Sequence, residues 1–133
     1  MPRALVIDDQ PHVRATVSVA LQASGFDVVA VESARSGLRE LKKTRLDAPR
    51  FDLAIIDIYM AEMDGVQLIK EVRERAPTLP IIAISGVFIR GSERTVLDLL
   101  PMAPGLSGIT CLQKPFRPKE LLQAVQKAIG VAE

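Results

Sequence analysis

Five short apolar segments recur along the chain, and each is followed by a stretch with helical periodicity or by a turn that leads into one. The apolar segments are residues 4–7, 26–31, 53–58, 81–84 and 109–112. Continuous apolar runs of this length are typical of strands buried on both faces of a parallel sheet. Their alternation with helices predicts an α/β fold: a single-domain, doubly wound (βα)5 arrangement in which helices cover both faces of a five-stranded parallel sheet.

Helix start and stop signals separate these segments. Pro11 suits a first helical turn, and Gly25 is expected to end that helix in the left-handed conformation. Ser33 has the side chain of a helix N-cap, and Asp64-Gly65 marks a turn before the third helix. Helices are expected over residues 11–24, from 34 to the basic cluster at 42–45, over 65–76, 92–100 and 118–131.

Size and composition narrow the classes of protein. The chain has 133 residues, which predicts one domain over residues 1–133. Its formal net charge is +1, and no run of basic residues marks a helical face, so we expect no direct binding to nucleic acid. Cys111 is the only cysteine, which favours a reducing, cytoplasmic location. No apolar stretch approaches the ~18 residues of a membrane span.

Polar residues end four of the five predicted strands. The first strand is followed by Asp8-Asp9, the third ends at Asp57, the fourth at Ser85, and the fifth is followed closely by Lys114. In an open α/β sheet the carboxyl ends of the strands border the crevice in which ligands bind. We therefore expect these side chains to form one site.

The chemistry of this group of residues predicts a metal and a nucleophile. Two carboxylates ~4 Å apart repel by about 4 kcal/mol at an effective dielectric constant of ~20, so a cation is needed. Carboxylate oxygens from Asp8, Asp9 and Asp57 suit Mg²⁺. Lys114 and the Ser85 hydroxyl can bind phosphate oxygens. Asp57, at the end of the most apolar strand, is the expected nucleophile, and its attack on phosphorus would give an acyl phosphate.

These residues resemble the receiver domain of two-component response regulators over residues 3–131. The matching motifs, in chain order, are Asp8-Asp9, Asp57 within DLAIIDIYM, Asp64-Gly65, Ser85-Gly86 and Lys114-Pro115-Phe116. The resemblance implies the strand order 2-1-3-4-5.

The resemblance also implies residue roles. Asp9 would bind Mg²⁺ directly, Asp8 mainly through water, and the backbone carbonyl of Tyr59 would add a ligand. The Lys114-Pro115 bond would be cis. The chain would be a phosphoacceptor switch rather than an enzyme, and would at most catalyse its own phosphorylation and dephosphorylation.

The partners implied by the resemblance are proteins. A histidine kinase or phosphotransfer protein would supply the phosphoryl group from a phosphohistidine. The output would reach a downstream protein, or a second copy of the chain, through the face formed by residues 92–131. The chain would act alone by protein contact or be one domain of a longer protein.

The chain departs from the family pattern at several positions. Cys111 stands where the family usually has the aromatic residue that moves with the Ser/Thr hydroxyl, which puts the usual output mechanism in doubt. The segment between Ser85 and Lys114 is longer than usual, with the extra length in residues 99–108. Tyr59 and Val87 are poor water-orienting groups, so we expect slow loss of the phosphoryl group.

Three other functions compete with this interpretation. A degenerate receiver could bind proteins without phosphorylation, which only the missing aromatic at Cys111 favours. A Mg²⁺-dependent phosphatase with an aspartyl nucleophile often has a second Asp two residues later, where this chain has Tyr59. A flavin-binding protein would want a phosphate-cradling loop, whereas DDQPHV would repel phosphate. His12 is expected to be a solvated residue, and Asp64-Gly65 to have a structural role.

Overall fold

The fold is a five-stranded parallel sheet between two layers of helices. A computed structural model describes residues 2–44, 49–58, 65–86 and 108–130. The strands are β1 (Arg3–Ile7), β2 (Asp27–Val31), β3 (Leu53–Asp57), β4 (Ile81–Ser85) and β5 (Thr110–Gln113). All pairings are parallel and the order is β2-β1-β3-β4-β5. The α/β class and the implied strand order are therefore confirmed.

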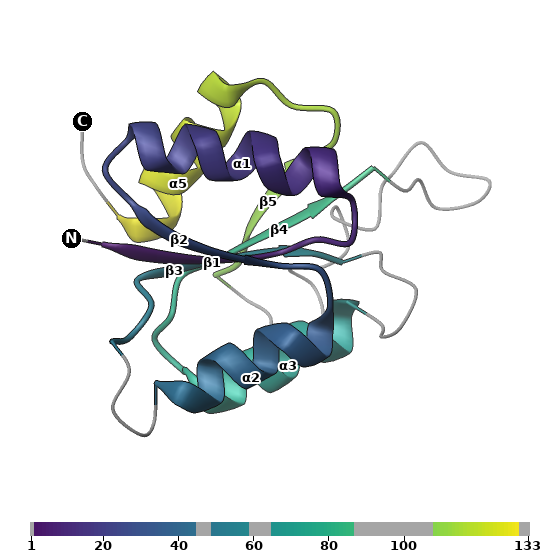
Figure 1. The fold of residues 1–133 in the computed structure, drawn as a ribbon, viewed down its shortest axis with the longest axis vertical. Helices are drawn as coiled ribbons and strands as arrows, with labels where there is room; N and C mark the ends of the chain where they lie inside the picture. The colour runs from purple at the N-terminus through teal and green to yellow at the C-terminus, as the bar shows by residue number, and fades with distance from the viewer. Residues whose placement is uncertain (1, 45–48, 59–64, 87–107, 131–133) are drawn as a thin grey trace.

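Helices cover both faces of the sheet. They are α1 (Pro11–Ala23), α2 (Ala34–Lys43), α3 (Gly65–Arg75) and α5 (Pro118–Ile129). Figure 1 shows the sheet edge-on, with α1 and α5 on one side and α2 and α3 on the other. The helix expected over residues 92–100 lies outside the described residues, as does most of the loop expected over 101–108.

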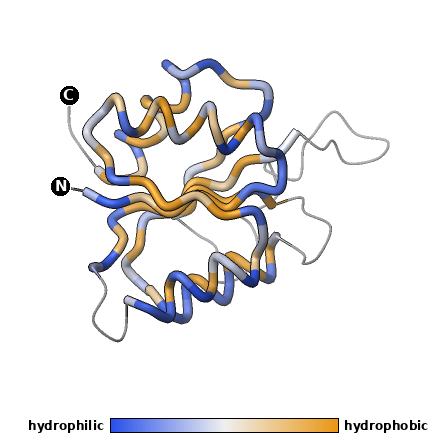
Figure 2. The backbone as a smooth tube through the Cα atoms, in the orientation of Figure 1, coloured by the Kyte–Doolittle hydropathy of each residue, from blue (hydrophilic) through white to orange (hydrophobic). Residues whose placement is uncertain are grey.

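The apolar side chains of the strands form two cores, one on each face of the sheet. In β1, Leu5 and Ile7 pack toward α2 and α3, whereas Ala4 and Val6 pack toward α1 and α5. Successive side chains of a strand point to opposite faces, so a continuous apolar run serves both cores. Figure 2 shows this as an apolar sheet between the helices, with hydrophilic residues along the outer sides of α2 and α3. Burial on both faces holds the strand ends in fixed positions.

Local signals set most of the helix boundaries. Pro11 opens α1, and Gly25 has a φ of +92°. The Ser33 hydroxyl accepts a hydrogen bond from the backbone N–H of Ser36 at 3.1 Å, which confirms the predicted N-cap. The prediction that the last helix reaches residue 131 is wrong. It ends at Ile129 because Gly130 adopts the left-handed conformation, with a φ of 74°.

Some predicted ends are shifted by one residue. α1 stops before Ser24, β2 starts after Phe26 and β3 stops before Ile58. Phe26 and Ile58 are nevertheless buried, so both are apolar because they pack in the core and not because they pair in a strand.

None of the described helices is long and apolar enough to cross a membrane.

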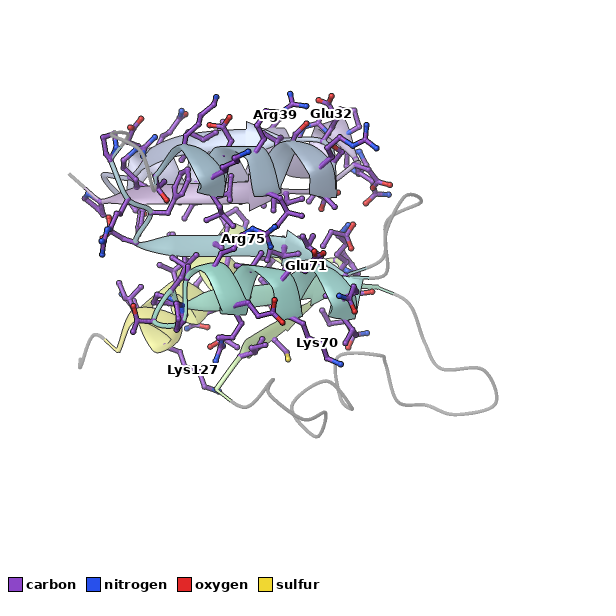
Figure 3. The ribbon with its side chains drawn as sticks, turned by 90° about the horizontal axis from the view of Figure 1, so that it is seen from below. Glu32, Arg39, Lys70, Glu71, Arg75 and Lys127 are labelled. Carbon is purple, nitrogen blue, oxygen red and sulfur yellow. The ribbon has the colours of Figure 1, made fainter. Side chains whose placement is uncertain are left out.

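The outer face of α3 is charged and exposed. Figure 3 shows Glu71 and Arg75 side by side on it, and their charged groups lie 3.9 Å apart. Exposed pairs of this kind contribute about 0.3–0.5 kcal/mol on a helix.

Candidate functional site

Three carboxylates meet at the carboxyl ends of β1 and β3. Ile7 of β1 pairs with Ile56 of β3, so Asp8 and Asp57 are the next residues on two adjacent strands. One oxygen from each of Asp8, Asp9 and Asp57 lies within 4.8 Å of the others. Asp8 and Asp57 are buried and Asp9 is exposed. The predicted acidic cluster is therefore present in the fold.

Lys114 brings a positive charge into this cluster from the end of β5. Its Nζ lies 3.0 Å from Oδ2 of Asp57 and 3.1 Å from Oδ2 of Asp8. Its backbone N–H donates to the carbonyl of Ser85 at 3.1 Å, which fixes the start of the side chain beside β4. The Lys114 side chain is 17% exposed, so these ion pairs are only weakly screened by water. Nζ also donates a hydrogen bond to Oε1 of Gln10 at 2.7 Å.

The carboxylate of Asp8 is only partly satisfied. Its Oδ1 accepts a hydrogen bond from the backbone N–H of Gln10 at 2.8 Å. Its Oδ2 is buried and, within the part of the chain that the structure describes, faces Lys114 as an ion pair but accepts no hydrogen bond. An oxygen of this kind is suited to bind a cation.

The charges of the cluster also fit a divalent cation. Asp8, Asp9 and Asp57 carry three negative charges, and Lys114 is the only ammonium group paired with them among the described residues. Hard oxygen ligands with one exposed side suit Mg²⁺, which keeps several waters when it binds to a few carboxylates. Receiver domains bind Mg²⁺ at such an acidic pocket.

Ser85 lies next to Asp57 in the sheet. Asp57 pairs with Ile84 of β4, and Ser85 is the following residue. Ser85 is fully buried at the end of β4 and is bound through its carbonyl to the backbone of Lys114. The predicted nucleophile, hydroxyl and lysine therefore come from three neighbouring strand ends.

Gly65, the first residue of α3, packs directly on the chain just after Asp57. A Cβ at this position would lie 2.1 Å from the Cα of Ile58 and 2.2 Å from its carbonyl oxygen. Backbone atoms cannot move aside as a flexible side chain can, so only glycine fits. The structural role expected for Asp64-Gly65 thus has a steric cause at Gly65, whereas Asp64 lies outside the described residues.

Some of the remaining predicted site positions lie within the described residues and others do not. The Lys114-Pro115 peptide bond is cis, as the resemblance implies. Cys111 is half-buried on β5 and packs against the core on the α2 and α3 side. The predicted Tyr59 carbonyl ligand and Val87 lie outside the described residues. His12 is exposed, as expected.

Gln10 is the residue of the site that the sequence did not reveal. It directly follows the acidic pair and occupies the N-cap of α1, where its side chain makes no capping hydrogen bond. A long amide at a position that favours Ser, Thr, Asp or Asn is the one signal that could have pointed to another partner.

The comparisons with known proteins agree with this geometry. The family model of the response regulator receiver domain matches residues 4–126. The chemotaxis protein CheY of Bacillus subtilis is 30% identical over 128 residues, which are 96% of this chain and 98% of that protein. The transcriptional regulatory protein GlrR of Escherichia coli is 36% identical over 126 residues, 94% of this chain. The chain spans only 26% of GlrR.

Solved structures show the same fold. The chemotaxis response regulator CheY4 of Vibrio cholerae superposes with a TM-score of 0.78 at 27% identity, covering 96% of this chain and 98% of that one. A response regulator receiver domain protein from Clostridium thermocellum gives a TM-score of 0.79 at 25% identity, covering 98% and 95% of the two chains.

Proposed function

Because the chain belongs to the response regulator receiver domain family, we propose that Asp57 accepts a phosphoryl group and that the chain signals by the conformational change that follows. The observation that carries the proposal is the contact of 3.0 Å between the Lys114 ammonium and the buried Asp57 carboxylate, beside Asp8 and Asp9. Even a paired buried carboxylate repays only part of its desolvation cost, so the retention of Asp57 here favours a chemical role.

The reaction is a phosphoryl transfer to oxygen. A carboxylate oxygen of Asp57 forms a bond to phosphorus as the phosphorus–nitrogen bond of a donor phosphohistidine breaks. The electron pair of that bond stays with the imidazole, and Asp57 becomes an acyl phosphate. Donor and acceptor must be in line at the transition state, so a fixed strand end is an effective place for the nucleophile.

Side chains around Asp57 stabilise the transferred group. Lys114 is placed to exchange its contact with Asp57 for one with a phosphoryl oxygen, and the Ser85 hydroxyl can donate to another. Asp8, Asp9 and Asp57, with the carbonyl of Tyr59, would hold Mg²⁺. When bound, the metal would neutralise charge on the carboxylates and on the phosphoryl group.

The partners follow from this chemistry. The donor is a histidine kinase or phosphotransfer protein in the cytoplasm, and the output is contact with a downstream protein or a second copy through the face of residues 92–131. Cys111 in place of an aromatic residue means that movement of Ser85 is read by other side chains. The chain itself is not expected to bind nucleic acid, although some of its longer relatives, such as GlrR, are transcriptional regulators.

Phosphorylation of the purified chain by acetyl phosphate, read by intact mass, tests the proposal. We expect a gain of one phosphoryl group that requires Mg²⁺ and that is absent in Asp57→Asn. Asp8→Asn should raise the Mg²⁺ concentration that is needed for half-maximal phosphorylation. The Glu74→Gln variant, which removes an exposed carboxylate from α3, is the matched control and should behave as the wild type.

A chain that gains no mass under these conditions would support the alternative, a degenerate receiver that binds its partner without phosphorylation. An adduct that persists in Asp57→Asn would assign the phosphoryl group to a different residue.

A further inference from the structure

We propose that Gln10 is a positioning residue for phosphorylation, because its amide oxygen holds the ammonium group of Lys114 over Asp57. The inference rests on the proposed function and deepens it. The distance of 2.7 Å between Oε1 of Gln10 and Nζ of Lys114 is shorter than the distances from that Nζ to Asp8 and to Asp57. The two residues are 104 positions apart in the chain, so the contact joins the start of α1 to the end of β5.

The backbone of Gln10 is fixed on both sides. Its N–H donates to Oδ1 of Asp8 at 2.8 Å. Its carbonyl accepts hydrogen bonds from the N–H groups of Val13 and Arg14 in the first turn of α1, both at 3.1 Å. Arg14 in turn donates from Nη1 to the carbonyl of Asp8 at 2.8 Å. The side-chain amide of Gln10 therefore contacts Lys114 from a backbone that is held in place by hydrogen bonds.

The ammonium group of Lys114 contacts Gln10, Asp8 and Asp57, and the contact with Gln10 is the one that the proposed chemistry leaves intact. A cation at Asp8 would weaken the attraction between Asp8 and the ammonium group of Lys114. A phosphoryl group on Asp57 would draw the ammonium group toward its own oxygens. The Gln10 amide takes part in neither event, so it can keep Lys114 in the site throughout.

The neutrality of the amide matters for the same reason. A carboxylate at this position would hold Lys114 too, but it would add a fourth negative charge beside Asp8, Asp9 and Asp57 and oppose an incoming phosphate. A neutral acceptor positions the cation without this repulsion. The hydrogen bond itself is charge-assisted, because its donor is an ammonium group.

The test compares Gln10→Met, which has similar length but no acceptor, with Gln22→Met, the same change at an exposed glutamine of α1. The readout is the initial rate of phosphorylation by acetyl phosphate at saturating Mg²⁺, in which the bond from phosphorus to Asp57 forms and acetate leaves. Because this hydrogen bond is exposed to water, its loss should have the effect of an ordinary hydrogen bond and lower the rate about threefold to tenfold in Gln10→Met. Gln22→Met should react at the wild-type rate.

A double-mutant cycle shows whether Gln10 acts through Lys114. In a Lys114→Met background, Gln10→Met should cause no further loss of rate. The same cycle, read without Mg²⁺ as the midpoint of urea unfolding, should show a shift for Gln10→Met that disappears in the Lys114→Met background. This second readout does not depend on phosphorylation.

Two results overturn the inference alone. One is a wild-type chain that is phosphorylated on Asp57 while Gln10→Met reacts as fast as Gln22→Met. The other is an effect of Gln10→Met that is equally large with and without Lys114. Failure of the wild type to take up a phosphoryl group would instead overturn the proposed function. The comparison of Gln10→Met with Gln22→Met needs no Lys114 variant, so it holds even if Lys114→Met does not fold.

Discussion

Replacing the proposed phosphoacceptor should make the protein more stable. Asp57 is buried beside two other carboxylates and shares one ammonium group with Asp8. Asp57→Asn keeps the shape and most of the hydrogen-bonding capacity of the side chain while it removes the charge. In the absence of divalent cations, we expect this variant to unfold at a higher urea concentration than the wild type.

The size of the effect follows from three terms. At an effective dielectric constant of ~20, the repulsion between Asp8 and Asp57, which lie within 4.8 Å, is at least about 3.5 kcal/mol, and the attraction between Lys114 and Asp57 at 3.0 Å is about 5.5 kcal/mol. The variant thus loses a net attraction of at most about 2 kcal/mol. It also avoids the desolvation penalty of a buried carboxylate, which is several kcal/mol. The free energy of unfolding should rise by about 1–2 kcal/mol.

Equilibrium unfolding in urea measures this change, first with EDTA and then with excess MgCl₂. Mg²⁺ should stabilise the wild type, because a ligand that binds only the folded state raises its stability, by about 2.7 kcal/mol at 100 times the dissociation constant. Asp57→Asn lacks one of the charged ligands and should gain less. The control Glu74→Gln removes an exposed charge from α3 and should stay within about 0.5 kcal/mol of the wild type in both conditions.

The reasoning is refuted if Asp57→Asn is clearly less stable than the wild type in EDTA while Glu74→Gln is unchanged. The carboxylate would then be part of a stabilising ion-pair network, and its presence would need no chemical explanation. A wild type whose stability does not respond to Mg²⁺ would contradict the assignment of the metal site.

Three further predictions concern the close packing at Gly65, the N-cap of α2 and the lifetime of the phosphoryl group. Gly65→Ala should lose about 2 kcal/mol of stability in urea, because its Cβ would meet the backbone of Ile58 at 2.1 Å; an unchanged midpoint would contradict the close packing. Ser33→Ala should cost about 1 kcal/mol in the same assay through the lost N-cap of α2, whereas Ser33→Asp should cost much less. The phosphorylated chain should lose its phosphoryl group slowly, because Tyr59 and Val87 orient water poorly; a half-life of a few seconds would contradict this.

The sequence was informative where one kind of interaction decides the structure. Apolar runs ended by Asp8 and Asp57 placed both residues at the ends of buried strands, because burial on both faces allows little else. Parallel strands then bring their carboxyl ends to one edge, so the acidic cluster and Lys114 could be predicted without knowing any distance. Gly25 and Ser33 were predictable because each acts within one turn of helix.

The sequence was less informative where segments distant in the chain meet. The contact between Gln10 and Lys114 is made by two long side chains that are 104 positions apart in the chain, and no periodic pattern marks it. The cost of a Cβ at Gly65 depends on how closely α3 packs on Ile58, which is a property of the whole fold. The last helix was predicted to reach residue 131, but Gly130 adopts the left-handed conformation and α5 ends at Ile129.

The most direct test of the central proposal is to locate the phosphoryl group. The chain is phosphorylated with acetyl phosphate and Mg²⁺, treated with borohydride, which reduces an acyl phosphate to an alcohol, and mapped by peptide mass. The proposed function predicts homoserine at position 57 only, and none when Mg²⁺ is removed by EDTA. Homoserine at Asp8 or Asp9, or an incorporated phosphoryl group that borohydride leaves untouched, as one on His12 would be, would contradict it.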